Sequence, residues 1–334
     1  MWINNLALKF KEIANSFPND VAIYLDNEKI TYKELDIYSD KIAKFLLTQN
    51  INSQDVINIS SLKIIEAFAI IVACWKTGII YSFIDRELPI TRIGYILEIC
   101  QPKLIIGEKL FIKKISNLKN IKLLSYENLK ELIKHNIEEE LNPDLPGNLI
   151  AYIMFTSGST GVPNGVSISH ESLLQFGEWS KNEYCIQRND NISGLNPLFF
   201  DNSVFDIYSS LLNGASLIPL SRVVVKDPKQ TIKVLNQFKI TIWFSVPSLL
   251  IYYLSFDLFD KDSFKYLKYI VFGGEGFPKN KLKKLYEIFK NRVILSNVYG
   301  PTEATCICSN YFINASDFND SEITKLSPLG KILN

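Results

Sequence analysis

Residues 151–166, AYIMFTSGSTGVPNGV, are the stretch that decides the fold of this chain. Residues 149–155 are almost continuously apolar, which predicts a buried strand. The loop that follows is small and rich in hydroxyl groups, and it leaves backbone N–H groups free to surround the oxygens of a polyphosphate. Its residues are Thr156, Ser157, Gly158, Ser159, Thr160 and Gly161. Pro163 and Gly165 then turn the chain towards a helix that starts near His170. An ordinary strand-to-helix connection has the same composition, so this stretch alone leaves both interpretations open.

The composition indicates a globular protein with a near-neutral charge. Hydrophobic residues make up 47% of the 334 residues, and 36 basic residues almost balance 35 acidic ones. This balance removes the general electrostatic argument for a nucleic-acid or membrane partner. The five cysteines and two histidines are scattered, which argues against a structural metal site and favours a reducing cytoplasm. Residues 64–84 are the most apolar region, but Glu66, Lys76 and Gly78 interrupt it, so we expect a buried helix and strand there.

Strand and helix patterns alternate along the chain, which predicts an α/β fold with mostly parallel sheets flanked by helices. The expected elements include a hairpin at 21–31, a helix capped by Thr31 with Glu34 three residues later, and strands at 56–59, 79–84, 191–195, 216–220, 241–245, 269–272 and 293–298. The acidic, apolar-poor segment 138–147 reads as a surface linker, with a possible subdomain boundary near 138–148. In such sheets, ligands bind beyond the carboxyl ends of the strands.

Unusual residues cluster just after three of the later strands, in the turns 200–203, 273–275 and 299–303. The pair Gly273-Gly274 lets a flat ring approach the backbone closely, and Tyr299 offers an aromatic face to its other side. Thr302 can donate a hydroxyl to a phosphate, and Glu303 can hold Mg²⁺, which prefers carboxylate and phosphate oxygens. Each turn alone is more simply a surface turn. Their joint spacing favours a single ligand crevice.

Asp201 is an acid with aromatic and aliphatic neighbours, in the segment FFDNSVF (199–205). A carboxylate in such surroundings is unfavourable unless it has a cationic partner. The competing interpretation is that Asp201 caps the helix predicted at 204–212.

These motifs resemble those of adenylate-forming enzymes. TSGSTGVPNGV (156–166), FDNS (200–203) and NVYGPTEAT (297–305) are similar to the core motifs of the superfamily, and ITYKEL (30–35) and WKTGIIYSFID (75–85) resemble two earlier ones. The resemblance is closest to the amino-acid adenylation domains of nonribosomal peptide synthetases and to D-alanine–carrier-protein ligases. It runs from about residue 14 to the end, within a single large AMP-binding domain at 1–334 to which the family adds a smaller β subdomain. No single motif is specific, but the ordered set is.

The resemblance implies a reaction. A carboxylate attacks the α-phosphate of Mg·ATP to form an acyl-adenylate, and the acyl group passes to a phosphopantetheine thiol on a separate acyl or peptidyl carrier protein. It also implies catalytic roles for Thr302 and Glu303, with Glu303 as the metal ligand. The remaining nucleotide-binding residues that it implies are the 156–161 loop, Asn164, Gly165, Gly274, Glu275, Asn297, Tyr299 and Gly300.

By the same resemblance, Asp201 pairs with the α-ammonium of an amino acid. This favours an amino acid over a fatty or aryl acid, which would leave a buried carboxylate unpaired. The implied pocket is lined by Asn202, Phe205, Phe244, Val271, Gly273, Val298, Cys306 and Ile307. This mostly apolar lining suggests an aliphatic substrate. An acyl- or aryl-CoA or carrier ligase of the same superfamily is the alternative.

The sequence departs from the family pattern at two places. Asn164 stands where the phosphate loop usually carries a lysine, which predicts weaker ATP binding. The segment LSPLGKILN (326–334) resembles the region just before the hinge of the family, so the small C-terminal domain with its catalytic lysine has no counterpart in these 334 residues. We therefore expect the chain alone to adenylate poorly and to need that domain in cis or in trans. A non-catalytic nucleotide-binding remnant is the third hypothesis.

Overall fold

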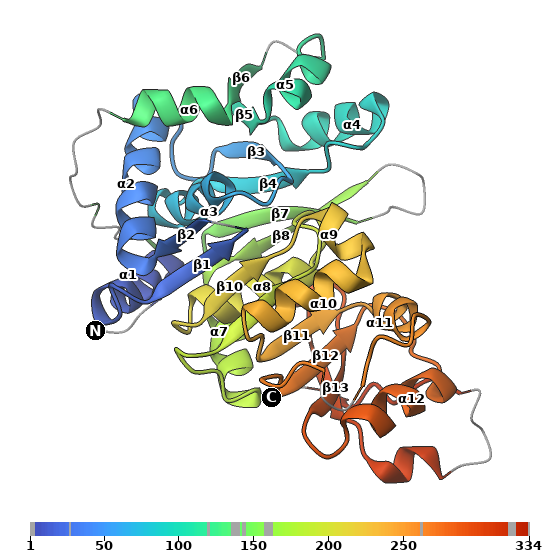
Figure 1. Ribbon diagram of the computed structural model, residues 1–334. Coiled ribbons are helices and arrows are strands. Elements are labelled where there is room, and N and C mark those ends of the chain that lie inside the picture. Colours follow the sequence, from blue (N-terminus) through green and yellow to red (C-terminus); the bar gives the residue numbers. More distant parts are fainter. Residues whose placement is uncertain are drawn as a thin grey trace.

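The computed structural model describes residues 4–26, 28–118, 121–134, 141, 145–156, 163–260, 263–319 and 325–332. Within them the strands form two sheets, one of nine strands and one of six, and helices flank both (Figure 1). All pairings are parallel except β1–β2, β7–β8, β13–β14 and β14–β15. The predicted α/β class with mostly parallel sheets is confirmed.

The six-stranded sheet has the order β6-β5-β3-β4-β7-β8. Its strands are β3 (Val56–Ser60), β4 (Ile80–Ile84), β5 (Leu104–Gly107), β6 (Lys122–Ser125), β7 (Ile150–Thr156) and β8 (Asn164–Ser169). The helices between them are α3 (Ile65–Thr77), α4 (Ile90–Cys100), α5 (Lys109–Ile115) and α6 (Tyr126–Ile133). Every residue of α3 except Ile65 is buried, which explains why this helix has no polar face.

The nine-stranded sheet has the order β15-β14-β13-β12-β11-β9-β10-β1-β2. Its strands are β1 (Val21–Leu25), β2 (Glu28–Thr31), β9 (Asn191–Gly194), β10 (Ser216–Pro219), β11 (Ile242–Ser245), β12 (Tyr269–Gly273), β13 (Ile294–Tyr299), β14 (Ser309–Phe312) and β15 (Lys331–Ile332). The remaining helices are α1 (Leu6–Ser16), α2 (Tyr32–Thr48), α7 (His170–Glu183), α8 (Asn202–Leu211), α9 (Arg222–Lys226), α10 (Pro228–Gln237), α11 (Pro247–Leu254), α12 (Lys279–Phe289) and the short η1 (Thr302–Ala304) and η2 (Ala315–Phe318).

Local signals fix several of these boundaries. Thr31 forms a capping box with Glu34: the Thr31 N–H donates to Glu34 Oε2 at 2.8 Å, and the Glu34 N–H donates to Thr31 Oγ1 at 3.2 Å. The largest buried cluster takes residues from α1, α2, α3, α7 and α8 and from strands of both sheets. This shared core lies between the sheets and holds them together.

The interpretation of residues 151–170 as a strand followed directly by a helix is wrong in one respect. β8 pairs with β7 in antiparallel register, from Thr156 opposite Asn164 to Ile150 opposite Ser169, so the loop joins a β-hairpin, and α7 begins only after β8. The sequence patterns also missed β14, β15 and α9. We call each sheet with its flanking helices a lobe. The predicted boundary near 138–148 falls between α6 and β7, which both belong to the six-stranded lobe, and this boundary remains a proposal. Within the described ranges, no helix has the length and apolar character needed to cross a bilayer.

Candidate active site

Three turns of the nine-stranded sheet lie together at the carboxyl ends of its parallel strands, the edge of the sheet where ligands are expected. β9, β12 and β13 lie in one parallel array through β11, so their carboxyl ends point the same way. Thr302 Oγ1, after β13, donates a hydrogen bond of 2.6 Å to Asp201 Oδ2, after β9. The structure thus joins the FDNS and YGPTE segments, 101 positions apart in the chain.

Asp201 stands at the N-cap position of α8, but its side chain accepts no capping hydrogen bond. The helix-cap explanation of this residue is therefore not supported. Burial raises the pKa of the Asp201 carboxyl, while hydrogen bonds from Thr302 and from neighbouring backbone N–H groups oppose the shift. Among the residues that the structure describes, no cationic side chain pairs with it. The carboxylate is thus available to a cation from a ligand.

The glycines around this edge differ in purpose. A Cβ on Gly273 would lie 2.4 Å from the carbonyl oxygen of Val298, and one on Gly300 would lie 2.4 Å from that of Cys306. These two positions therefore serve close packing of neighbouring backbones. Gly274 has φ +87°, which favours glycine, and its nearest neighbour is the Asn202 amide, 3.5 Å from an added Cβ. Gly274 is thus required for its backbone conformation, since an added Cβ would make only ordinary contacts.

The residues predicted to form an apolar wall pack against one another in the core. The rings of Phe205 and Phe244 lie 4.8 Å apart, and Phe244 is in register with Val271 on the adjacent strand. Strand alternation places Trp243 and Ile270 in a different core cluster, so the choice of Phe244 and Val271 for this wall is in register. The wall residues are all at most 4% exposed and share one cluster: Phe205, Phe244, Val271, Val298, Cys306 and Ile307.

The hairpin that carries the predicted phosphate loop approaches the same edge. Tyr152 and Met154 of β7 face the core between the sheets, so Thr156 lies on that face too. η1, which contains Thr302, packs against β8. Asn164 is an exposed residue at the start of β8, and Gly165 pairs with Phe155. The predicted loop residues Ser157, Gly158, Ser159, Thr160 and Gly161 lie outside the described residues.

Comparison with known proteins now decides the family. The sequence pattern of the family described as AMP-binding enzyme matches residues 10–334. The chain belongs to this family. It is 30% identical over 290 residues to the D-alanine–D-alanyl carrier protein ligase of Bacillus anthracis (strain CDC 684 / NRRL 3495), covering 86% of this chain and 57% of that protein. It is 31% identical over 291 residues to the ligase of the same name in Bacillus cereus (strain Q1), again covering 86% and 57%. The chain thus spans a little over half the length of these curated relatives.

Solved structures agree with the fold. The nonribosomal peptide synthetase FmoA3 superposes with a TM-score of 0.87 at 21% identity, covering 98% of this chain and 34% of that one. The N-terminal subdomain of Klebsiella oxytoca NpsA, in complex with 3-hydroxybenzoyl-AMSN, superposes with a TM-score of 0.86 at 22% identity, covering 99% and 81%. At these identities the likeness establishes the fold alone.

The other predicted nucleotide residues of this AMP-binding enzyme have distinct settings. Tyr299 is 47% exposed at the end of β13. Glu275 Oε2 accepts a hydrogen bond from the Ser248 backbone N–H at 3.1 Å, which ties together the turns after β11 and β12. Asn297 is buried, and its amide donates to Ser327 Oγ at 2.9 Å and to the Pro328 carbonyl at 2.6 Å. Its side chain holds the segment 327–328 in place.

The Glu303 carboxylate suits a Mg²⁺ ion that arrives bound to a nucleotide better than a metal held by the protein alone. Glu303 is exposed on η1, and within the described ranges no group of three or more His, Cys, Asp or Glu side chains could hold an ion. Mg²⁺ commonly takes one or two carboxylates and completes its shell with phosphates and water. Glu303 would hold such an ion only together with a bound nucleotide.

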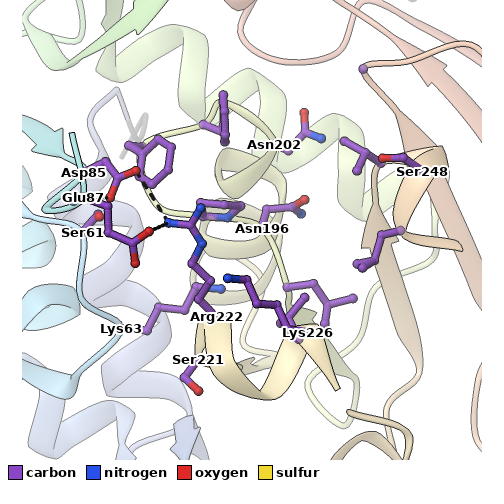
Figure 2. A pocket seen from close by; sticks show the side chains of 18 of the residues that line it. Ser61, Lys63, Asp85, Glu87, Asn196, Asn202, Ser221, Arg222, Lys226 and Ser248 are labelled. Atoms are coloured by element: carbon purple, nitrogen blue, oxygen red, sulfur yellow. Dashed lines mark hydrogen bonds and ion pairs between the residues drawn. The ribbon is translucent and has the colours of Figure 1, made fainter. Parts of the chain in front are cut away.

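A cavity of about 860 Å³ opens beside Asp201 (Figure 2). Its lining comes from the turns after β3, β4, β9, β10, β11 and β12, as expected for ligand sites in parallel sheets. Asp201, Asn202, Gly274 and Glu275 line it, whereas Thr156, Thr302 and Glu303 do not. The residues predicted as an apolar wall do not line it either, so these four are the predicted site residues that belong to the cavity within the described part of the chain.

Sequence reasoning missed the basic residues of this cavity, Lys63, Arg86, Arg222 and Lys226. Lys63 Nζ donates to the Gly194 carbonyl at 2.6 Å, and Asn196 Nδ2 donates to the Asp206 carboxylate at 3.1 Å. Burial lowers the pKa of Lys63 and raises the pKa of Asp206, and the attraction between the two charges opposes both shifts. Their position in the sequence could have identified them. Lys63 follows strand β3 and Asn196 follows strand β9, and ligands bind beyond the carboxyl ends of such strands.

Proposed function

We propose that this chain is the large domain of an amino-acid-activating ligase. It would form an aminoacyl-AMP from ATP and an amino acid, and a carrier-protein thiol would then take the aminoacyl group. The observation that carries the proposal is the Asp201 carboxylate. It lines a ligand-sized cavity, and no described side chain neutralises it. An α-ammonium group would supply the missing positive charge, and the side chain of the amino acid would pack against the apolar residues predicted as a wall.

The division of the site supports three binding regions. The hairpin with Thr156, Asn164 and Gly165 lies against η1 with Thr302 and Glu303, which suits the phosphates and their Mg²⁺. Gly274 and Glu275, next to Tyr299 on the neighbouring strand, suit the adenine ring. The cavity of about 860 Å³, lined by both lobes, suits the phosphopantetheine arm of a carrier protein. The carboxyl carbon would then be held between the nucleotide and the thiol, and catalysis would come from positioning and charge placement.

The substrate class follows from the wall. Phe205, Phe244, Val271, Val298, Cys306 and Ile307 offer no charge, which favours a small aliphatic amino acid. The relatives from Bacillus anthracis and Bacillus cereus are D-alanine–D-alanyl carrier protein ligases, and D-alanine is a small amino acid. An aryl or fatty acid would leave Asp201 without a counter-charge.

Stable sulfamoyl analogues of acyl-adenylates provide the test, because they need no turnover. We expect aminoacyl analogues (D-alanyl, valyl, leucyl and isoleucyl) to bind this chain more tightly than benzoyl or octanoyl analogues in calorimetry. Asp201→Asn should weaken the aminoacyl analogues by about 10- to 100-fold, since a hydrogen bond to a charged group contributes about 1.5–3 kcal/mol, and should leave the benzoyl analogue unaffected. Equal losses for both classes, or tighter binding of the benzoyl analogue by the unmodified chain, would contradict the proposal.

A further inference from the structure

Arg222 lines the cavity, and because its side chain is 52% exposed we call this side of the cavity its mouth. It is the first residue of α9, in the nine-stranded lobe, and its guanidinium Nη1 lies 2.6 Å from Glu87 Oε2 and 3.8 Å from Asp85 Oδ2. Both acids follow β4 of the six-stranded sheet, so the contact joins the two lobes across the opening. Figure 2 shows this arrangement with the ion pairs as dashed lines.

The charges that line the cavity balance at rest. The lining contains four basic residues, Lys63, Arg86, Arg222 and Lys226, and four acidic ones, Asp85, Glu87, Asp201 and Glu275. Asp85 and Glu87 are engaged by Arg222, and Asp201 is the ammonium partner in the proposed function. If a ligand anion took the place of these two carboxylates on Arg222, the mouth would offer it a fixed positive group, with Lys63 and Lys226 on the same lining.

The Arg222 contact is of the exchangeable kind. The side chains of Arg222 and Glu87 are 52% and 54% exposed, and an ion pair this exposed is held weakly because water and salt screen it. Asp85 is 12% exposed, but its oxygen lies 3.8 Å from the guanidinium, beyond hydrogen-bond distance, so it too holds Arg222 weakly. The planar guanidinium fork binds two phosphate oxygens at once, which a single carboxylate at 2.6 Å with a second at 3.8 Å does not match. A phosphate arriving at the mouth is therefore the better partner.

We propose that Arg222 is a positioning residue that exchanges Glu87 and Asp85 for the phosphate of the ligand entering the cavity. This rests on the proposed function, in which a phosphate-bearing thiol enters there. The same chemistry could be supplied by a nucleotide phosphate, because Gly274 and Glu275 line the cavity as well. The thiol donor is favoured, since its arm must pass the mouth to reach the carboxyl carbon.

The test compares ligands that differ only in the phosphate. Calorimetry on the unmodified chain should show that 4′-phosphopantetheine binds about tenfold more tightly than pantetheine, a difference that shrinks as salt is raised. Arg222→Ala should remove this preference, Arg222→Lys should keep part of it, and Glu87→Gln should increase it about threefold, because the competing carboxylate is gone. Arg188→Ala is the matched control: Arg188 forms an exposed ion pair with Asp20 at 3.4 Å, away from the cavity, and should change nothing.

A second pair of ligands, AMP and adenosine, separates the two phosphate sources. If Arg222→Ala abolishes the AMP preference and leaves the phosphopantetheine preference intact, the nucleotide is the partner and the thiol assignment is wrong. If neither preference depends on Arg222, or Glu87→Gln lowers both, the exchange itself is refuted. Binding of aminoacyl sulfamoyl analogues is measured on the same variants. It should not respond to Arg222, so a failure of the amino-acid proposal is seen separately.

Discussion

Two clusters of ion pairs have similar distances and opposite surroundings. Lys76 Nζ lies 2.6 Å from Asp36 Oδ1 and 2.7 Å from Asp40 Oδ1, and its side chain is 3% exposed. Arg222 approaches Glu87 just as closely, at 2.6 Å, but is 52% exposed. Burial is therefore what separates them: the Lys76 cluster is a fixed part of the packing between helices, and the Arg222 cluster can be exchanged. Distance alone would rank the two as equal.

The buried cluster connects three helices. Lys76 on α3 reaches Asp36 and Asp40 on α2, and Lys11 on α1 adds a second contact to Asp36 at 2.7 Å. Burial raises the pKa of the Asp40 carboxyl, and the neighbouring Lys76 opposes the shift. Charges taken out of water this completely need all their partners, because a lone buried charge is strongly unfavourable.

Lys76→Ala should therefore have the largest effect on stability. It leaves Asp40 without its ion-pair partner and Asp36 with Lys11 alone, and we expect the free energy of unfolding in urea to fall by about 3–5 kcal/mol. Lys290→Ala removes an exposed ion pair between Lys290, just after α12, and Glu287 on that helix, and it should leave the free energy of unfolding essentially unchanged. A loss below about 1 kcal/mol for Lys76→Ala would show that burial does not separate the two clusters.

A buried histidine extends the contrast to pH. His170 is fully buried, its Nδ1 accepts a hydrogen bond of 3.4 Å from the Leu6 N–H, and burial lowers its pKa to about 4. Because the folded pKa lies below the unfolded value of about 6.5, this group stabilises the fold above pH 6.5, and the contribution is lost as the pH falls from there to about 4.

The loss over that window should reach about 3 kcal/mol, from roughly 2.5 pKa units at 1.36 kcal/mol each. Urea unfolding at several pH values measures it. His170→Gln, which keeps an acceptor for Leu6, should be less stable at pH 7 but should show a flatter profile between pH 6.5 and 4. Parallel profiles for the two proteins would mean that His170 does not titrate in this range.

Asp201 should give stability a pH dependence opposite to that of His170. Its pKa is raised by burial, so the charged form destabilises the fold as the pH rises through the folded pKa. Asp201→Asn should therefore raise the free energy of unfolding at pH 7 by roughly 0.5–1 kcal/mol, while aminoacyl binding falls. The gain should vanish near pH 3, where the native carboxyl is protonated as well. A destabilised variant at pH 7 would indicate that Asp201 is structural.

The sequence predicted the elements whose signals are local. The Thr31 capping box and the buried α3 followed by β4 both depend on residues near one another in the chain. β8 was missed because Pro163 and Gly165 resemble a turn, and its strand character comes from pairing with β7. β15 is a short edge strand and β14 is the short strand beside it, and no local pattern reveals their pairing partners.

The site divides in the same way. Asp201 was singled out because it lies in a motif, and strand register places Phe244 opposite Val271, whereas the role of the wall residues stays a prediction. The Arg222 cluster could not be predicted, because it joins the turn after β4 to the turn after β10, which approach one another only when the two sheets pack. Arg222 lies in a segment with no motif, and nothing local indicates that Glu87 is its partner.

The smallest effect on stability should come from the exposed Arg222 cluster, in contrast to the buried Lys76 cluster. Arg222→Ala, Glu87→Gln and the double variant should each change the free energy of unfolding by less than about 1 kcal/mol, with a coupling energy of about 0.2–1 kcal/mol in a double-mutant cycle. Raising the salt concentration should reduce that coupling further, because both side chains are exposed to screening. A coupling above about 2 kcal/mol would make the Arg222 cluster a fixed bridge between the lobes. A ligand phosphate could then not displace the carboxylates. The double-mutant cycle on stability therefore also tests the proposed exchange at Arg222.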